Sequence, residues 1–90
     1  MDFLNKYVSD KIVDLICENN DENIVYSIIL NKELVSNNIE LLSKKGIYKI
    51  EELLISYLEL FLMDTDKLNN KLIDDKIKLI NEDVINVENL

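Results

Sequence analysis

Hydrophobic residues recur at helical spacing in the first part of the chain. One apolar stripe follows the three- and four-residue spacing of an amphipathic helix, with Phe3 and Tyr7 beside it. The stripe consists of Leu4, Val8, Ile12, Leu15 and Ile16. Asp2 is a suitable N-cap, and its negative charge suits a helix N-terminus. We therefore predict a helix over residues 2–19.

Two further helices are predicted over residues 21–35 and 38–45. The polar runs Asn19-Asn20-Asp21 and Ser36-Asn37-Asn38 are the predicted breaks before each of them. The helix over residues 38–45 is predicted to end at Lys44-Lys45-Gly46, because Gly is favoured just past a helix end. Residues 24–30 are also typical of a β-strand, being rich in β-branched side chains. We prefer a helix because no other segment offers a pairing strand.

Residues 48–63 are predicted to form the central helix of the fold. A heptad-like series makes one face, and further apolar residues fill most of the remaining circumference. The two sets are Ile47, Ile50, Leu54, Tyr57, Leu58 and Phe61, and then Leu53, Ile55, Leu60, Leu62 and Met63. A helix that is apolar nearly all round is normally buried on several sides. This helix is therefore either the hub of a bundle or partly covered by a second chain, which makes a homodimer an expectation.

The last helix is predicted over residues 66–81, after the capping sequence Asp64-Thr65-Asp66. Its inward residues are predicted to be Leu68, Leu72, Ile73, Ile77 and Ile80. Residues 81–90 alternate polar and apolar side chains, so they could extend this helix, fray, or dock as an extended segment. Together the elements predict an all-α fold, a compact bundle of four to five helices in a single domain over residues 1–90. One Gly and no Pro agree with that class, because β-rich folds need more of both.

Composition indicates an origin and a compartment rather than a chemistry. The chain lacks Ala, Arg, Gln, His, Pro and Trp and is rich in Ile, Asn and Lys, which is typical of an AT-rich genome. Such genomes occur in low-GC bacteria, in their phages and plasmids, and in some viruses and protists. Cys17 is the only cysteine, and no secretory signal or membrane-length apolar run is present. We therefore expect a cytoplasmic protein.

Negative charge is concentrated in two parts of a chain whose net charge is −8. Residues 1–31 and 51–66 are acidic, and residues 32–50 between them are locally basic. The second acidic part contains five acids and no lysine: Glu51, Glu52, Glu59, Asp64 and Asp66. They predict an acidic patch for a protein partner with a basic surface. The alternative is that these acids cap helices, since they lie at predicted helix starts.

A lysine turn around Gly46 offers a different kind of surface. Residues 41–54 read as helix, Gly turn and helix, and Lys44, Lys45 and Lys49 surround the turn. The pattern resembles the helical hairpins of helix-hairpin-helix and SAM-like domains, although it has one glycine where that family usually has two. The resemblance implies contact between turn amides and a nucleic-acid phosphate, whereas a plain αα-hairpin explains the same residues. Tyr48 is either an exposed anchor or a ring packed over the hairpin with its hydroxyl in water.

Catalytic and metal chemistry find little support in the residues. With no His and one Cys, the chain lacks the ligands of zinc and most transition-metal sites. Asp64, Asp66 and Asp75 have part of the spacing of a calcium loop, but Leu68 and Asn69 replace a ligand and the turn glycine. Cys17 has no histidine to activate it. We expect neither an enzyme nor a bound cofactor or metal.

The expected function is therefore binding. We expect a non-enzymatic regulator or inhibitor that holds another protein through an acidic helical surface built on Tyr48 and the five acids of residues 51–66. In general appearance the chain is similar to anti-defence inhibitors of phages, plasmids and viruses, such as anti-CRISPR proteins. The alternative is a homo-oligomeric helical-hairpin module that binds nucleic acid through Lys44, Lys45 and Lys49. The overall negative charge argues against nucleic acid, and we expect no membrane partner.

Overall fold

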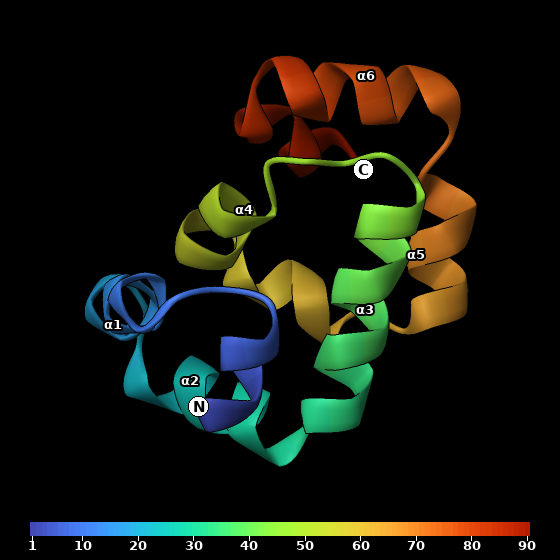
Figure 1. Cartoon of the computed structure of the whole chain (residues 1–90). Helices are drawn as coiled ribbons and strands as arrows, with labels where there is room; N and C mark the ends of the chain where they lie inside the picture. The colour runs from blue at the N-terminus through green and yellow to red at the C-terminus, as the bar shows by residue number, and fades with distance from the viewer.

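The computed structural model describes all residues, 1–90, and every regular element of the fold is a helix (Figure 1). There is no strand, so residues 24–30 are helical and the all-α class is confirmed. The structure has six α-helices and three 3-10 helices. In chain order these are η1 (Asp2–Lys6), α1 (Asp10–Asn19), α2 (Glu22–Leu30), α3 (Lys32–Lys44), α4 (Ile50–Ser56), η2 (Leu58–Leu62), α5 (Thr65–Lys71), α6 (Asp74–Glu82) and η3 (Val84–Asn89).

The predicted helix over 2–19 is interrupted between Lys6 and Asp10. Residues 2–6 form η1, and α1 begins after Ser9, whose hydroxyl accepts a hydrogen bond from the Ile12 amide at 3.4 Å. Ser9, rather than Asp2, is therefore the N-cap of the first α-helix. A serine inside an apolar-periodic run can compete for backbone amides in this way and start a new helix.

The break predicted at residues 36–38 is wrong, because α3 runs through it without interruption. The chain turns at Asn31 instead. Asn38 is fully buried, and its Nδ2 donates to the carbonyl oxygens of Phe61 at 2.9 Å and Met63 at 2.7 Å. Its Oδ1 accepts a hydrogen bond from the Thr65 hydroxyl at 2.8 Å. A residue that has the composition of a turn is thus a polar group in the core, satisfied by a distant part of the chain.

The predicted helix end at Gly46 is confirmed in atomic detail. Gly46 has a φ of 93°, a left-handed conformation that glycine adopts without steric cost. The Gly46 amide donates to the Ser43 carbonyl, and the Ile47 amide donates to the Leu42 carbonyl. This pair of bonds is a Schellman motif, which closes the carbonyl end of α3.

The predicted continuous helix over 48–63 is wrong, although its burial is confirmed. The helix breaks at Tyr57, whose φ and ψ are −135° and 47°, and continues as the 3-10 helix η2 in the middle of the fold (Figure 1). The break lets the two halves direct their apolar side chains into different parts of the core. No apolar side chain between Ile50 and Met63 is exposed. One chain therefore covers this segment, and the reason to expect a homodimer is removed.

Two asparagines bind carbonyl groups near the C-terminal ends of α4 and of η2. Asn20 Nδ2 donates to the Ile55 carbonyl at 3.0 Å, and Asn38 serves the end of η2 as described above. Unpaired carbonyls inside a protein are costly, so these side chains stabilise the broken form of the segment.

The predicted helix over 66–81 is divided into α5 and α6 at Leu72 and Ile73. The capping prediction at residues 64–66 is confirmed, since the Asp64 carboxylate accepts from the Lys67 amide at 3.1 Å. Ile73, predicted to face inward, is 57% exposed because it lies in the turn. Residues 84–89 neither fray nor extend α6. They form η3, which folds back against α6 and buries Val87.

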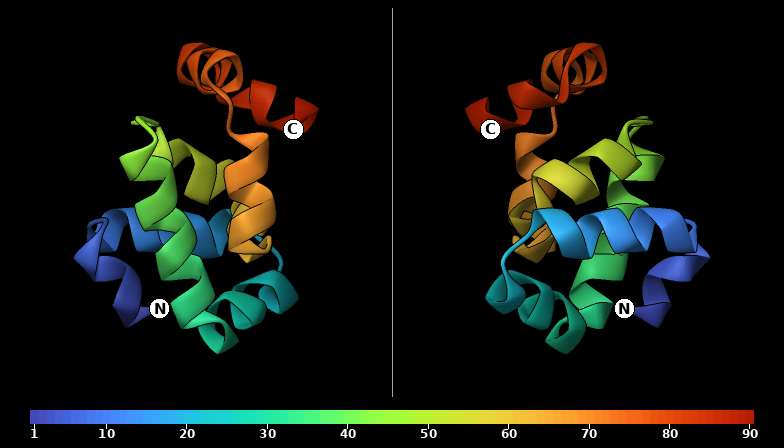
Figure 2. Two further views of the ribbon diagram at one scale, coloured as in Figure 1. Left: turned by 90° about the vertical axis from the view of Figure 1, so that its right-hand side faces the viewer. Right: turned by 90° about the vertical axis from the view of Figure 1, so that its left-hand side faces the viewer.

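Buried apolar side chains from all nine helical elements meet in one cluster. The molecule measures 32 × 23 × 22 Å along its principal axes. Side views place α6 and η3 at one end and α2 at the opposite end (Figure 2). None of the helices has the length and apolar character that crossing a membrane requires.

Candidate functional site

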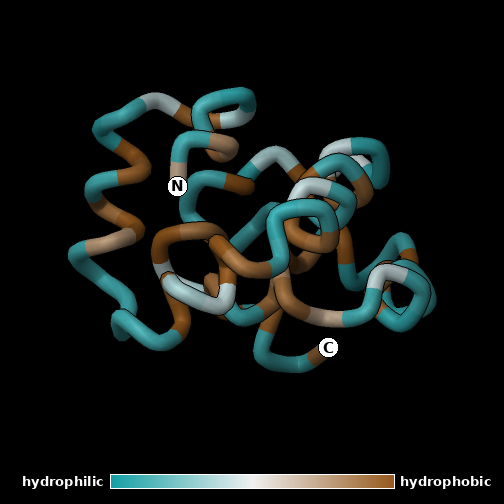
Figure 3. The backbone as a smooth tube through the Cα atoms, turned by 90° about the horizontal axis from the view of Figure 1, so that it is seen from below, coloured by the Kyte–Doolittle hydropathy of each residue, from teal (hydrophilic) through white to brown (hydrophobic).

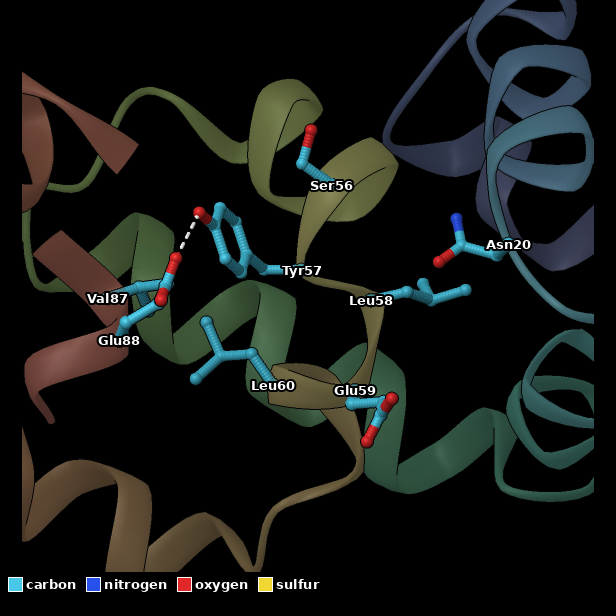
Figure 4. A pocket seen from close by; sticks show the side chains of 8 residues that line it. All are labelled: Asn20, Ser56, Tyr57, Leu58, Glu59, Leu60, Val87 and Glu88. Atoms are coloured by element: carbon cyan, nitrogen blue, oxygen red, sulfur yellow. Dashed lines mark hydrogen bonds between the residues drawn. The ribbon is translucent and has the colours of Figure 1, made fainter. Parts of the chain in front are cut away.

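A hollow of about 330 Å³ lies beside the break at Tyr57. Figure 4 shows that the Tyr57 ring and the Glu88 carboxylate point toward one another, while Asn20 lies across the hollow on the α1–α2 connection. The Tyr57 hydroxyl donates to Glu88 Oε2 at 2.7 Å. Glu59 also borders the hollow, so two carboxylates lie on its rim.

The Tyr57–Glu88 bond acts as a latch rather than as a reactive pair. The hydrogen bond to Glu88 raises the pKa of the Tyr57 hydroxyl, and partial burial and the charges of Glu88 and Asp83 raise it further. A tyrosine that serves as a general base needs the opposite shift, toward neutral pH. Tyr57 therefore stays protonated and ties η3 to the break between α4 and η2.

Three of the five acids of the predicted acidic patch border three different hollows. Glu51 and Tyr48 line one between α3 and α4, Glu59 lines the hollow at the break, and Asp66 lines a third beside α5. These three acids therefore do not gather around one hollow.

Helix capping accounts for most of these acids. Glu51 and Glu52 lie in the first turn of α4, Asp66 lies in the first turn of α5, and Asp64 caps α5. Acids at helix N-termini complement the helix dipole. These positions agree with the alternative interpretation of the charge pattern, in which the acids cap helices.

The three lysines of the turn have different surroundings. Lys44 and Lys45 are exposed, but they border the same hollow as Asp66. Lys49 Nζ donates to the Glu82 carbonyl at 3.3 Å, at the end of α6. A cation at the carbonyl end of a helix stabilises that helix. One of the three positive charges is thus engaged within the chain.

The amides of the same turn are also engaged. Those of Gly46 and Ile47 close α3, and the Tyr48 amide donates to Asn81 Oδ1 at 3.2 Å. The Tyr48 ring is 73% exposed, and its hydroxyl donates to the Asn81 carbonyl at 3.4 Å rather than lying free in water. The turn therefore presents no free amide for a phosphate at residues 46–48.

A further surface, which the sequence analysis missed, is formed by α1 and α2. A hollow of about 530 Å³ lies between the two helices, and we call it and its rim the α1–α2 surface. Its residues are Cys17, Glu22, Asn23, Val25, Tyr26 and Ile29, with Leu30 one turn beyond Tyr26. Figure 3 looks at the molecule from the α2 end and shows α2 as a mostly hydrophobic segment beside the alternating pattern of α1.

Exposed apolar side chains distinguish the α1–α2 surface from an ordinary helical face. Tyr26 is 62% exposed and Leu30 is 64% exposed, and the four-residue spacing puts them on one stripe. Of the apolar residues of α2, only Ile28 is fully buried. The signal in the sequence is that apolar residues occupy more than one side of α2, since Tyr26 and Leu30 accompany Ile24, Val25, Ile28 and Ile29 in a nine-residue helix.

Positive charge is absent from this part of the chain. Residues 12–31 contain no lysine, whereas they contain four acids: Asp14, Glu18, Asp21 and Glu22. All four are exposed. The other exposed large apolar residues lie within residues 44–90, which contain seven of the ten lysines: Tyr48, Ile73, Leu79 and Ile85. The segment that forms the α1–α2 surface thus combines exposed apolar side chains with four exposed acids, and the nearest lysines along the chain are Lys11 and Lys32 at its two ends.

Comparison with protein-family models, with curated proteins and with solved structures finds no match to this chain.

Within the structure, no group of three or more His, Cys, Asp or Glu side chains is arranged to hold a metal ion.

Proposed function

We propose that the chain is a non-catalytic regulator or inhibitor that binds another protein through the α1–α2 surface. The observation that carries this proposal is the exposed apolar stripe of Tyr26 and Leu30 inside a lysine-free, acidic part of the chain. Exposed aromatic and aliphatic side chains in a concave setting are typical of the centre of a protein interface. The surrounding acids select a partner of positive charge and speed its approach.

A binding role also agrees with the groups that line the surface. Cys17 is exposed and is the only nucleophilic thiol in the chain, and Glu22 is the only carboxylate in the lining of the hollow. These groups can orient a partner, but they supply no acid–base pair of the kind that general acid–base catalysis requires. The AT-rich composition and the small size fit an inhibitor encoded by a phage, plasmid or virus. This biological class does not itself identify any binding residue.

Site-directed photo-cross-linking tests this function. A photo-cross-linking phenylalanine derivative is placed at Tyr26, at Tyr48 or at Ile85 in the full chain, in extracts of the source organism or its host. We expect position 26 to capture one protein with a basic surface, in a yield that falls as salt rises. Position 85 is the control for a similarly exposed apolar residue elsewhere.

Two results would contradict the proposal. If no position captures a protein at low salt, the chain does not act by binding proteins in these cells. If position 48 captures the partner and position 26 does not, the binding surface is the one around Tyr48 and Glu51 instead.

A further inference from the structure

The α1–α2 surface has a shape and chemistry that restrict what can occupy it. The side chains of Val25 and Ile29, one turn apart on α2, line the hollow between the helices, and Tyr26 and Leu30 form the next stripe. Val25 and Ile29 are half-buried, so their exposed parts continue the apolar strip into the hollow. The result is an apolar strip along one side of α2, with Cys17 of α1 on the facing wall.

The backbone around the strip favours a helical occupant over an extended one. Both α1 and α2 satisfy their own amides and carbonyls internally, and the fold has no strand edge to which a peptide could add. An extended segment lying on this surface would leave its backbone groups without partners in the apolar centre. A helix satisfies its own backbone and needs to present only side chains, at the same three- and four-residue spacing.

Charge decides between a second copy of the chain and a different partner. Two copies that met through this surface would bring two lysine-free acidic segments, residues 12–31, against each other. Like charges that face each other at an interface oppose association, so they discriminate against a partner of the same charge. A helix whose apolar stripe is flanked by lysine or arginine has the complementary charge.

We infer that the α1–α2 surface binds one amphipathic, positively charged α-helix of a partner protein. This inference rests on the function proposed above and specifies the chemistry of the partner at the same surface. The apolar stripe of that helix lies between Cys17 and Tyr26, and its basic residues face the acids of α1 and of the start of α2.

Synthetic helices provide the probe for this inference. A small panel of peptides of about 18 residues, long enough to be helical, has Leu, Phe or Met on one face and Lys or Arg on the other. One control peptide has Glu in place of the basic residues, and a second has the same composition without amphipathic spacing. Affinity for the full chain is measured by fluorescence anisotropy.

Cys17 reports where the peptide binds. It is exposed, it lines the hollow, and it is the only thiol in the chain, so its rate of alkylation is a single-site signal. We expect a saturating basic helix to slow alkylation at least about tenfold, and we expect neither control peptide to do so. The double variant Tyr26→Ser/Leu30→Ser should weaken binding at least about tenfold.

The matched control is Ile73→Ser/Ile85→Ser, which removes two similarly exposed apolar side chains from the C-terminal half. It should bind the basic helix as the unaltered chain does. Because all four positions are more than half exposed, both double variants should remain folded, and circular dichroism checks this. A variant that is folded and still binds at full affinity after loss of Tyr26 and Leu30 overturns the inference.

The remaining outcomes separate the inference from the proposed function. If no basic helix binds but Tyr26 cross-links to a protein in extracts, the function stands and the inference is wrong. If Cys17 becomes protected without peptide as the protein concentration rises, and light scattering shows a dimer, the occupant is a second copy. If a basic helix protects Cys17 but no cellular partner is captured, the surface chemistry stands and the proposed function fails.

Discussion

The segment Ile50–Met63 and the helix α2 are both runs of large apolar residues, and the fold places them in opposite settings. Every apolar side chain of Ile50–Met63 is buried or half-buried within the chain, whereas α2 leaves Tyr26 and Leu30 more than half exposed. The first segment lies in the middle of the fold, and α2 lies at one end of it (Figures 1 and 2). An apolar run is therefore covered only where other elements surround it.

The two segments also differ in continuity. Ile50–Met63 breaks at Tyr57, and Asn20 and Asn38 bind carbonyls on either side of that break. In contrast, α2 is an unbroken helix, with Asp21 as its N-cap and Asn31 as its C-cap. Breaking the helix allows side chains from its whole circumference to reach the core. A continuous helix at the end of a molecule buries one side and leaves the other available to a partner.

The largest expected effect comes from the same substitution made in each segment. Leu54→Ala should reduce the free energy of unfolding by about 2–5 kcal/mol, because Leu54 is completely buried and its loss leaves a cavity. Leu30→Ala should change it by no more than about 0.5 kcal/mol, because Leu30 is mostly in water. Urea unfolding followed by circular dichroism measures both. Equal losses for the two variants would mean that α2 is as well covered as the central segment.

A second pair of variants tests whether buried polar groups maintain the break. Asn38→Ala removes the donor that serves the Phe61 and Met63 carbonyls, and it should reduce the free energy of unfolding by about 2–4 kcal/mol. The neighbouring Asn37 is exposed, so Asn37→Ala is the matched control and should stay within about 0.5 kcal/mol. The same unfolding measurement applies. A small loss for Asn38→Ala would show that η2 does not depend on this side chain.

The smallest expected effect concerns the latch between Tyr57 and Glu88, and it depends on pH. The hydrogen bond from Tyr57 to Glu88 raises the pKa of the Tyr57 hydroxyl in the folded chain. The unfolded chain therefore loses this proton first. The stabilisation is fully present below the ordinary pKa of tyrosine and disappears as pH rises through the raised value.

The stability advantage of the unaltered chain over Tyr57→Phe should accordingly shrink above about pH 10. Ultraviolet absorbance of tyrosinate should show that Tyr57→Phe removes the most alkaline part of the titration and that Glu88→Gln moves it to lower pH. Tyr26→Phe, on the exposed face of α2, is the control for losing one tyrosine. A stability difference that does not change with pH in this range would argue against the latch.

Local signals in the sequence were sufficient for the helical class and for several helix ends. Gly46 ends α3 as predicted because its left-handed φ is a property of glycine itself. Asp64 caps α5 as predicted because a carboxylate can reach an amide three residues away. The polar run around Asp21 separates α1 from α2 for the same reason. Each of these features depends on residues within a single helical turn.

The candidate binding surface was not predictable in the same way. The density of acids in residues 51–66 predicted one acidic patch. In the structure these acids lie at the starts of different helices, and they border separate hollows. Tyr26 and Leu30 were given no role in the sequence analysis, because an apolar residue carries no mark of whether anything packs on it. Only the position of α2 at the end of the molecule exposes Tyr26 and Leu30.

The sequence by itself determined that this protein is all-α, that it is strongly acidic, and that its helices end at residues such as Gly46. The tertiary structure alone decided that the apolar run 48–63 would break at Tyr57 and that Asn38 would be buried inside a continuous helix. The partners of Asn38 lie 23 and 25 residues away along the chain, beyond the reach of any local pattern. The tertiary structure also decided which apolar face stays in water, because burial is a property of the neighbours that the fold brings to a residue.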